Sequence, residues 1–175
     1  MRKLKLEELN RLSLDEFHEA EKQPVTVILD NIRSMHNVGA VFRTADAFLI
    51  EKVILCGITP IPPHREIRKT AIGAEESVSW EYQPNIVSVV ASLKAEGYKI
   101  FSVEQTDQSI PLNQFLPSYE KCAVVFGNEV EGVSQEIVDI SDVSVEIPQF
   151  GTKHSLNVSV AAGIVLYKLT IETGR

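Results

Sequence analysis

The stretch from Val25 to Leu49 reads VTVILDNIRSMHNVGAVFRTADAFL and decides the fold class. Its first five residues are apolar or β-branched, which is typical of a strand that is buried on both faces. A polar loop follows, and the pattern from Val38 to Leu49 predicts a helix. A buried strand that leads through a loop into a helix is the repeating unit of α/β folds.

The same alternation continues along the chain. Further buried strands are predicted at residues 52–56, 78–82, 99–103, 122–126 and 143–147. Further helices are predicted at residues 85–97, 134–140 and 156–169. We therefore expect an α/β fold with a mostly parallel six-stranded sheet and helices on both faces. In such folds, ligands bind at the carboxyl ends of the strands.

The composition limits the class of protein. The chain has 175 residues, of which 44% are hydrophobic, and this predicts one folded domain. No apolar run approaches the roughly 20 residues of a membrane helix, and none follows the basic start as in a signal peptide. Cys56 and Cys122 lie inside apolar runs, so we expect a reduced, cytoplasmic protein without a metal site. The net charge of −7 excludes a uniformly basic coat for nucleic acid but not a local basic patch.

Residues 1–24 are predicted to form an N-terminal arm, and residues 25–175 to form the domain. Ser13 and Glu16 have the spacing of a capping box, which predicts a short helix that ends near residue 23, before Pro24. The side chains expected to face the domain are Leu14 and Phe17. The basic residues of the arm either contact a polyanion or are only solvated; they are Arg2, Lys3, Lys5 and Arg11.

The loop after the first strand is long and rich in hydrogen-bonding groups. Asn37 is a candidate N-cap for the following helix, and Gly39 would allow a backbone or a ligand to come close. Arg43 lies one turn into that helix among apolar neighbours, and a buried guanidinium needs an anionic partner. That partner is either a carboxylate of the protein or a phosphate or other anion of a ligand.

Residues 126–134 read FGNEVEGVS and directly follow a buried strand. Gly127 and Gly132 allow a tight turn with exposed backbone groups, which suits a small ligand. Neither a phosphate-binding P-loop nor a GxGxxG motif is present. The two acidic residues disfavour a polyphosphate and favour a cationic or hydroxyl-bearing ligand, and a plain strand–turn–helix connection is the alternative.

Residues 147–159 read IPQFGTKHSLNVS and follow the last strand. Ser155 is expected to be the N-cap of the C-terminal helix. Asn157 lies in the first turn of a helix that should pack inside the fold, where a buried amide needs hydrogen-bond partners.

Together, the three loops resemble the SpoU/TrmH family, within the SPOUT class of S-adenosylmethionine-dependent RNA methyltransferases. Residues 37–45 match the family motif N-x-G-A-x-x-R-T-A, and residues 127–132 match G-x-E-x-x-G. Residues 147–159 are similar to I-P-x-x-G-x-x-x-S-L-N-V-S, with Gln149 where methionine is expected. Three motifs in order, each after a strand, are more specific than any one of them. The resemblance covers residues 25–169.

The resemblance implies a deep trefoil knot, in which the C-terminal helix is threaded through a loop. It also implies that the knot loops hold S-adenosylmethionine, the methyl donor, in a bent form and largely through backbone groups. The residues implied around the donor are Val103, Glu104, Gln105, Gly127, Gly132, Ile147 and Leu156. A sulfonium donor is positively charged and carries no phosphate, which agrees with an acidic loop.

The implied reaction is methyl transfer to a ribose 2′-hydroxyl of RNA, with Arg43 as the catalytic residue. Because a guanidinium is effectively always protonated, we expect Arg43 to clamp a phosphate and to stabilise the oxyanion rather than to act as a literal base. The other residues of the expected catalytic set would orient Arg43, the phosphate or the ribose; they are Asn37, Glu129, Ser155 and Asn157.

RNA binding requires local positive charge. The residues expected to supply it are Arg33, His64, Arg65, Arg68, Lys69 and Lys153, although residues 64–69 could equally be a solvated helix turn. The resemblance implies a homodimer, and the apolar residues of 156–169 are either core or dimer face. Short relatives without an added RNA-binding domain often act on tRNA. We therefore expect tRNA, in preference to rRNA, as the substrate. The alternative function is a non-catalytic RNA-binding homologue that keeps the fold.

Overall fold

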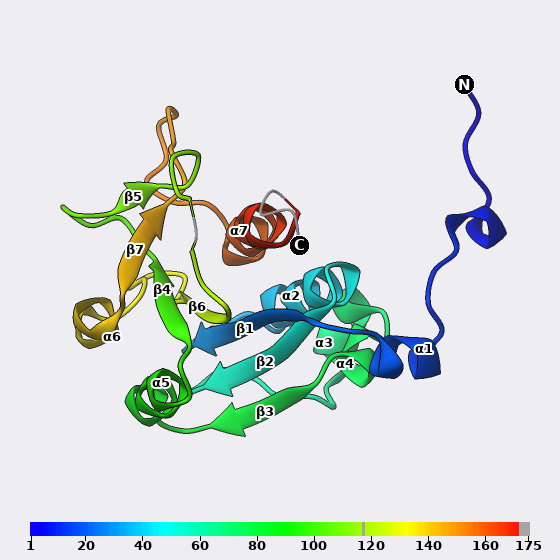
Figure 1. Ribbon diagram of the computed structural model, residues 1–175, viewed down its shortest axis with the longest axis horizontal. Helices are drawn as coiled ribbons and strands as arrows, with labels where there is room; N and C mark the ends of the chain where they lie inside the picture. Colours follow the sequence, from blue (N-terminus) through cyan, green and yellow to red (C-terminus); the bar gives the residue numbers. More distant parts are fainter. Residues whose placement is uncertain (117, 172–175) are drawn as a thin grey trace.

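The computed structural model describes residues 1–116 and 118–171, so residues 172–175 of the predicted domain lie outside the described part (Figure 1). The strands are β1 (Gln23–Asp30), β2 (Ile50–Cys56), β3 (Trp80–Gln83), β4 (Lys99–Val103), β5 (Ile110–Pro111), β6 (Cys122–Phe126) and β7 (Val143–Glu146). The helices are η1 (Leu6–Leu9), α1 (Leu14–Glu19), α2 (Met35–Ala47), α3 (Arg65–Ala71), α4 (Ala74–Ser77), α5 (Ile86–Ala95), α6 (Gln135–Ile140) and α7 (Val158–Thr170).

Within the described residues, the strands form one sheet in the order β3-β2-β1-β6-β4-β7-β5, and every strand pair is parallel. The predicted α/β class and parallel sheet are therefore confirmed. The predicted number of six strands is wrong, because the sheet has seven. The additional strand, β5, has only two residues and lies at the edge beside β7, so it is too short to produce an apolar pattern.

Alternating side chains of β1 explain why helices cover both faces of the sheet. Val27 and Leu29 belong to one core cluster with α2 and α7, whereas Ile28 belongs to a second cluster with α5 and α6. Figure 1 shows these two pairs of helices on opposite sides of the sheet. All three side chains are fully buried, as expected for a central strand of a parallel sheet. None of the described helices is long and apolar enough to cross a membrane.

The capping box predicted at the start of α1 is confirmed. Ser13 N donates to the Glu16 carboxylate at 2.7 Å, and Glu16 N donates to Ser13 Oγ at 3.3 Å. Phe17 is buried as expected, but Leu14 is 47% exposed, so its predicted packing against the domain is wrong. The helix also ends earlier than predicted, at Glu19, because Gln23 N already donates to Leu49 O and begins β1.

Two predicted N-caps are wrong. Ser34 caps α2 by accepting from Asn37 N, so the loop after β1 is shorter than expected and Asn37 lies inside the first turn. Asn157 rather than Ser155 caps α7, because its Oδ1 accepts from Ser159 N at 2.9 Å. In both cases the asparagine also takes part in a contact between distant loops.

Gly39 marks the place where α2 crosses α3. A Cβ atom at this position would lie 2.2 Å from the carbonyl oxygen of Ile67. The close approach expected at Gly39 is therefore confirmed, and the approaching group is the backbone of α3. This contact fixes α3 and its basic residues beside the first turns of α2.

Candidate functional site

The three motif loops meet at one edge of the sheet. β1 and β6 are neighbours, but the chain continues from β1 towards β2 on one side, whereas β6 pairs with β4 on the other. The carboxyl ends of β1 and β6 therefore form a topological switch point, which is where open α/β sheets bind ligands.

Glu129 joins the loops that follow β1 and β6. Its Oε1 accepts hydrogen bonds from Ser34 N at 3.1 Å and from Asn37 Nδ2 at 3.0 Å. Its Oε2 accepts from Arg33 N at 2.9 Å. Asn157, at the start of α7, donates from Nδ2 to Asn37 Oδ1 at 3.0 Å. One chain of hydrogen bonds, Glu129–Asn37–Asn157, thus connects all three motifs. Asn157 is exposed rather than buried, so its predicted burial is wrong, but its amide group is fully used.

The hydrogen bonds to Glu129 favour its charged form. Partial burial raises the pKa of this carboxyl, but the bonds from Arg33 N, Asn37 and Ser34 outweigh burial and lower the pKa below its ordinary value. The folded pKa therefore lies below the unfolded value of about 4.3. The stabilisation from these bonds is complete above the unfolded pKa and is lost as the pH falls through the folded pKa.

We expect Asn37→Ala to raise the pKa of Glu129 towards its ordinary value, because one of the bonds that favour the carboxylate is removed. A carbon-13 NMR titration of the glutamate side chains measures this shift. Gln135→Ala is the control, since that side chain bonds Asp139 on α6 instead. A pKa of Glu129 that is the same in Asn37→Ala and in the wild type would contradict the network.

A cleft of about 490 Å³, here called the donor cleft, opens beside this network. All seven residues that the family resemblance places around the methyl donor line it: Val103, Glu104, Gln105, Gly127, Gly132, Ile147 and Leu156. Three members of the expected catalytic set also line it, namely Glu129, Ser155 and Asn157. The structure therefore brings residues from three different loops, those after β4, β6 and β7, into one cavity.

The turn after β6 is closed by two backbone hydrogen bonds between Asn128 and Gly132, of 3.0 and 2.9 Å. A Cβ atom on Gly127 would lie 2.2 Å from the carbonyl carbon and oxygen of Gly132. Gly132 itself has φ = +70°, and a Cβ atom there would meet the Glu104 carboxylate at 2.2 Å. The tight turn predicted from the two glycines is present: backbone atoms leave no room for a side chain at Gly127, and the positive φ of Gly132 favours glycine there.

The loop after β4 holds the other walls of the donor cleft in place. Glu104 Oε2 accepts from Val133 N at 2.8 Å, and Glu104 Oε1 accepts from Gln105 N at 2.8 Å. Gln105 Nε2 donates to the backbone oxygen of His154 at 2.7 Å. Glu104 and Gln105 therefore act on the shape of the cleft through the neighbouring loops.

The charge of the donor cleft is negative. Among its described lining residues, four are glutamates, and none is lysine or arginine. Such a wall disfavours a polyphosphate and suits a ligand that carries positive charge and is held by backbone groups. Across the described residues, no group of three His, Cys, Asp or Glu side chains is placed to hold a metal ion.

Arg43 lines a second cleft of about 1110 Å³ between α2 and α7, here called the arginine cleft. The prediction that Arg43 is buried is wrong, because the side chain is exposed. No acidic side chain in the described part of the chain lies within 4 Å of it, so the ligand alternative is favoured over an internal ion pair. Ile147 lines both the arginine cleft and the donor cleft, which makes the two clefts neighbours.

The six residues predicted to bind RNA are all exposed: Arg33, His64, Arg65, Arg68, Lys69 and Lys153. Lys69 lines the arginine cleft, whereas Arg33 and Lys153 line none of the three described clefts. Part of this charge is compensated, because Arg68 pairs with Glu76 at 2.6 Å and Lys69 pairs with Glu66 at 2.7 Å. His64 caps α3, and its Nδ1 accepts from Glu66 N.

Sequence reasoning missed two charged residues in the clefts. Glu146 lines the donor cleft, and it could have been identified from its position at the carboxyl end of β7, because ligands bind at that edge of a parallel sheet. Lys168 lines the arginine cleft from the last turn of α7, far along the helix from the motif residues. Only the packing of α7 against α2 brings Lys168 near Arg43, and no local pattern signals that contact.

Comparisons with known proteins agree with this arrangement. The family model of the SpoU rRNA Methylase family matches residues 24–167. The 23S rRNA (guanosine-2′-O-)-methyltransferase RlmB of Neisseria meningitidis is 35% identical over 87% of this chain and 60% of its own length. The tRNA (guanosine(18)-2′-O)-methyltransferase of Escherichia coli is 31% identical over 85% of this chain and 64% of its own length. The chain thus spans less than two thirds of either relative.

Among solved structures, the A. aeolicus TrmH/SpoU tRNA modifying enzyme superimposes with a TM-score of 0.80 at 30% identity. The match covers 90% of this chain and 80% of that one. The family model spans all three motif loops and nearly the whole sheet, and the fold agrees with that of a solved relative. The chain therefore belongs to the SpoU rRNA methylase family.

Proposed function

We propose that this protein transfers a methyl group from S-adenosylmethionine to a ribose 2′-hydroxyl of RNA. The observation that carries this proposal is the Glu129–Asn37–Asn157 chain, which connects an acidic, backbone-rich cleft to a neighbouring cleft whose arginine has no acidic partner among the described residues. The first cleft suits a cationic small molecule, and the second suits a phosphate-bearing substrate. Membership of the family supports the same assignment.

The residues of the donor cleft fit the methyl donor. Four glutamate side chains and no described lysine or arginine line the cavity, and its glycine turn leaves backbone groups accessible. When bound, S-adenosylmethionine supplies a methyl group on a positively charged sulfur. The residues that would hold it are those of the turns at Gly127, Ile147 and Leu156, with the loop of Glu104 and Gln105 beside them.

Arg43 is proposed to bind a phosphate of the RNA and to stabilise the 2′-oxygen as it loses its proton. The hydroxyl oxygen forms the new bond to the methyl carbon, the bond from that carbon to sulfur breaks, and the hydroxyl proton passes to solvent. Asn37 and Asn157 fix the position of the first turn of α2, which carries Arg43 about two turns further on. Ser155 is proposed to face the same acceptor from the opposite loop.

The substrate is proposed to be tRNA in the cytoplasm rather than rRNA, as in the tRNA-modifying relatives. The test is to incubate the protein with labelled donor and total tRNA, and then to identify the methylated nucleoside by mass spectrometry. A 2′-O-methylated nucleoside is the expected product. Transfer to rRNA alone would contradict the choice of tRNA, and donor binding without transfer to any RNA would favour a non-catalytic RNA-binding protein.

The trefoil knot implied by the resemblance belongs to this proposal. It is supported by family membership and by the position of the loop between β7 and α7, which lines the donor cleft together with the turn after β6. The test is an experimental chain trace through residues 119–170. A last helix that lies outside every loop would contradict the knot.

The protein is further proposed to act as a homodimer through α7. Three side chains on this helix and one at its C-cap are 39–53% exposed although they are large and apolar: Val160, Ile164, Tyr167 and the C-cap Ile171. Their spacing of i, i+4, i+7 and i+11 places them on one stripe. In contrast, Val165 and Leu166 are buried, which assigns them to the core. Contiguous apolar surface of this kind marks an interface, and a second copy seated on it would form part of the wall of the arginine cleft, which Ile164 and Tyr167 also line.

Ile164→Asp is expected to convert the dimer to a monomer. In a symmetric dimer the stripe of each copy lies in the interface, so one substitution changes the interface at two places. A central substitution that costs about 2 kcal/mol per copy therefore raises the dissociation constant roughly 10³-fold. Light scattering after size exclusion measures the mass of the particle. Ile58→Asp is the matched control, because Ile58 is 66% exposed in the loop after β2 and should leave the dimer intact. A wild-type protein that is monomeric at micromolar concentration would refute the proposed interface.

A further inference from the structure

A third cleft, of about 690 Å³, lies on the other side of α3 from Arg43 and is here called the tryptophan cleft. It is built from the turn before α3, from α3 and α4, and from the first residue of β3. Its lining residues include Pro63, Arg65, Arg68, Glu75 and Trp80. Neither the family motifs nor the proposed methyl transfer uses this cavity.

Glu75 on the wall of this cleft has an unsatisfied carboxylate. Its side chain is only 9% exposed, and Oε2 is buried without any hydrogen-bond partner. Oε1 forms an ion pair with Arg68 Nε at 3.8 Å, a distance that is too long for a hydrogen bond. Arg68 instead donates to Glu76 Oε1 at 2.6 Å. A carboxylate oxygen that is buried without a donor is costly, so turning this side chain towards a ligand in the cleft that supplies N–H groups would be favourable.

The other walls suit a flat, apolar ring with an attached anion. Trp80 and Pro63 offer apolar surface, and an aromatic side chain stacks on the face of an unpaired base. Arg65 is exposed at the rim, where it can contact a phosphate. Among the bases, guanine presents two adjacent N–H donors, N1 and N2, which match the two oxygens of a carboxylate. Adenine presents an acceptor at N1, which a carboxylate repels.

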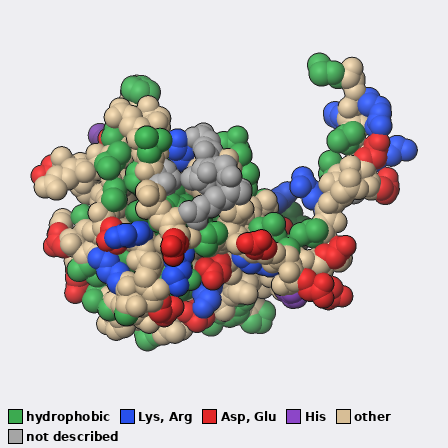
Figure 2. Space-filling model, viewed as in Figure 1, with side chains coloured by type: hydrophobic (Ala, Val, Ile, Leu, Met, Phe, Trp, Pro, Cys, Tyr) green, Lys and Arg blue, Asp and Glu red, His purple; other side chains and the backbone are tan. Residues whose placement is uncertain are grey.

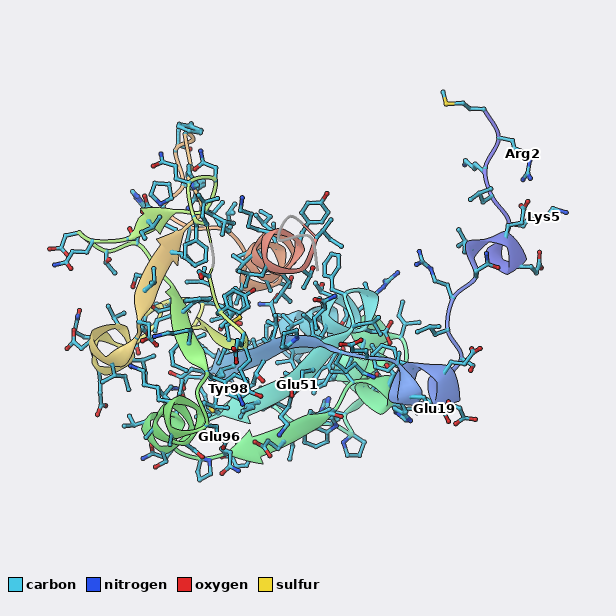
Figure 3. All side chains as sticks on the ribbon, in the orientation of Figure 1. Arg2, Lys5, Glu19, Glu51, Glu96 and Tyr98 are labelled. Atoms are coloured by element: carbon cyan, nitrogen blue, oxygen red, sulfur yellow. The ribbon has the colours of Figure 1, made fainter. Side chains whose placement is uncertain are left out.

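The tryptophan cleft lies where an RNA that enters the arginine cleft can continue. Lys69 lines both cavities, so α3 alone separates them. The N-terminal arm leaves the domain beside α4 (Figure 1). Figures 2 and 3 show Lys and Arg side chains along this arm, with Arg2 and Lys5 well away from the body. The arm and its cations therefore lie on the side of the domain where α4 lies.

We propose that the tryptophan cleft binds a guanine base, with the Glu75 carboxylate accepting from N1 and N2 and with Trp80 against the ring. The base is part of the RNA but is not the nucleotide that receives the methyl group. The assignment to RNA rests on the proposed function, whereas the recognition of guanine rests on Glu75 and Trp80 alone.

Trp80 is the only tryptophan in the sequence, so its fluorescence reports on this cleft. Titration with guanosine 5′-monophosphate is expected to quench this fluorescence to saturation. Adenosine 5′-monophosphate is expected to require an at least about tenfold higher concentration for the same quenching. Glu75→Gln should remove most of this preference, because the amide presents one donor to the donors of guanine. Glu136→Gln is the matched control, since Glu136 is exposed on α6 and lines none of the three described clefts, so the preference should be kept.

The pentanucleotides UUGUU and UUAUU distinguish RNA from a free nucleotide. UUGUU is expected to bind more tightly than guanosine monophosphate, since its additional phosphates can reach Arg65 and Lys69. Equal quenching by the two mononucleotides, or an unchanged preference in Glu75→Gln, would overturn the guanine site. Quenching by the mononucleotide but not by UUGUU would overturn its assignment to RNA. Fluorescence does not depend on methyl transfer, so a failure of the proposed reaction is seen separately.

Discussion

Replacing Arg43 with alanine is expected to lower the rate of methyl transfer by about 10²–10³-fold, the usual effect of removing one group that stabilises an oxyanion. The affinity for the donor should be unchanged, because Arg43 lines the arginine cleft and not the donor cleft. Single-turnover transfer to tRNA and calorimetric titration with the donor measure the two quantities. An Arg43→Ala protein with wild-type turnover would remove Arg43 from the proposed mechanism.

Arg43→Lys separates the two chemical roles of the guanidinium. Lysine keeps the positive charge but loses the planar fork that grips a phosphate, so a phosphate clamp predicts a rate still at least about tenfold below the wild type. Lysine could also act as a base more readily than arginine, because its ordinary pKa of about 10.4 is lower than that of arginine. A rate restored by lysine, with a pH dependence near that pKa, would favour a base and contradict the clamp.

Gly127→Ala is expected to weaken donor binding by at least about tenfold and to lower the stability of the fold. The added Cβ would lie 2.2 Å from the backbone of Gly132, so the turn must open and its two hydrogen bonds with Asn128 must lengthen. Overpacking of this kind costs about 1–3 kcal/mol in the free energy of unfolding. Calorimetric titration with the donor and thermal unfolding measure the two effects.

Gly163→Ala is the control for this substitution. A Cβ atom at Gly163 meets nothing within 4 Å, and the residue lies in the middle of α7 outside the donor cleft. We expect unchanged donor affinity and no loss of stability, because alanine favours a helix more than glycine does. Equal donor affinity in Gly127→Ala and in the wild type would show that the turn is not part of the donor site.

Much of the fold could be predicted because its strands are apolar runs. Val27 and Ile28 are buried on opposite faces of the sheet, and a run of such apolar residues is typical of a strand that is covered on both faces. The ends of the helices were harder to predict, because several residues near each end can act as the cap and tertiary contacts determine which of them does. Ser155 and Asn157 both suit an N-cap, but only Asn157 also reaches Asn37 across the site.

The motif residues of the donor cleft could be identified because each follows a strand, and strand ends gather at one edge of the sheet. Glu75 could not be identified in this way. It lies in a four-residue helix, and its Oε2 stays without a partner because Arg68 donates its hydrogen bond to Glu76 instead. The exposure of Arg43 was also missed, because apolar neighbours in sequence lie on other faces of the helix.

The strand order also bears on how the chain leaves the ribosome. β1, β2 and β3 are synthesised first and pair with one another, but the other side of β1 receives its partner only when β6 emerges, about 100 residues later. At the usual rates of translation, that interval lasts roughly 5–20 s. Throughout it the nascent chain presents an open apolar edge, which invites pairing with other chains. The centre of the sheet is thus completed late in synthesis, and mutations that weaken β6 should reduce the yield of folded protein before they affect its activity.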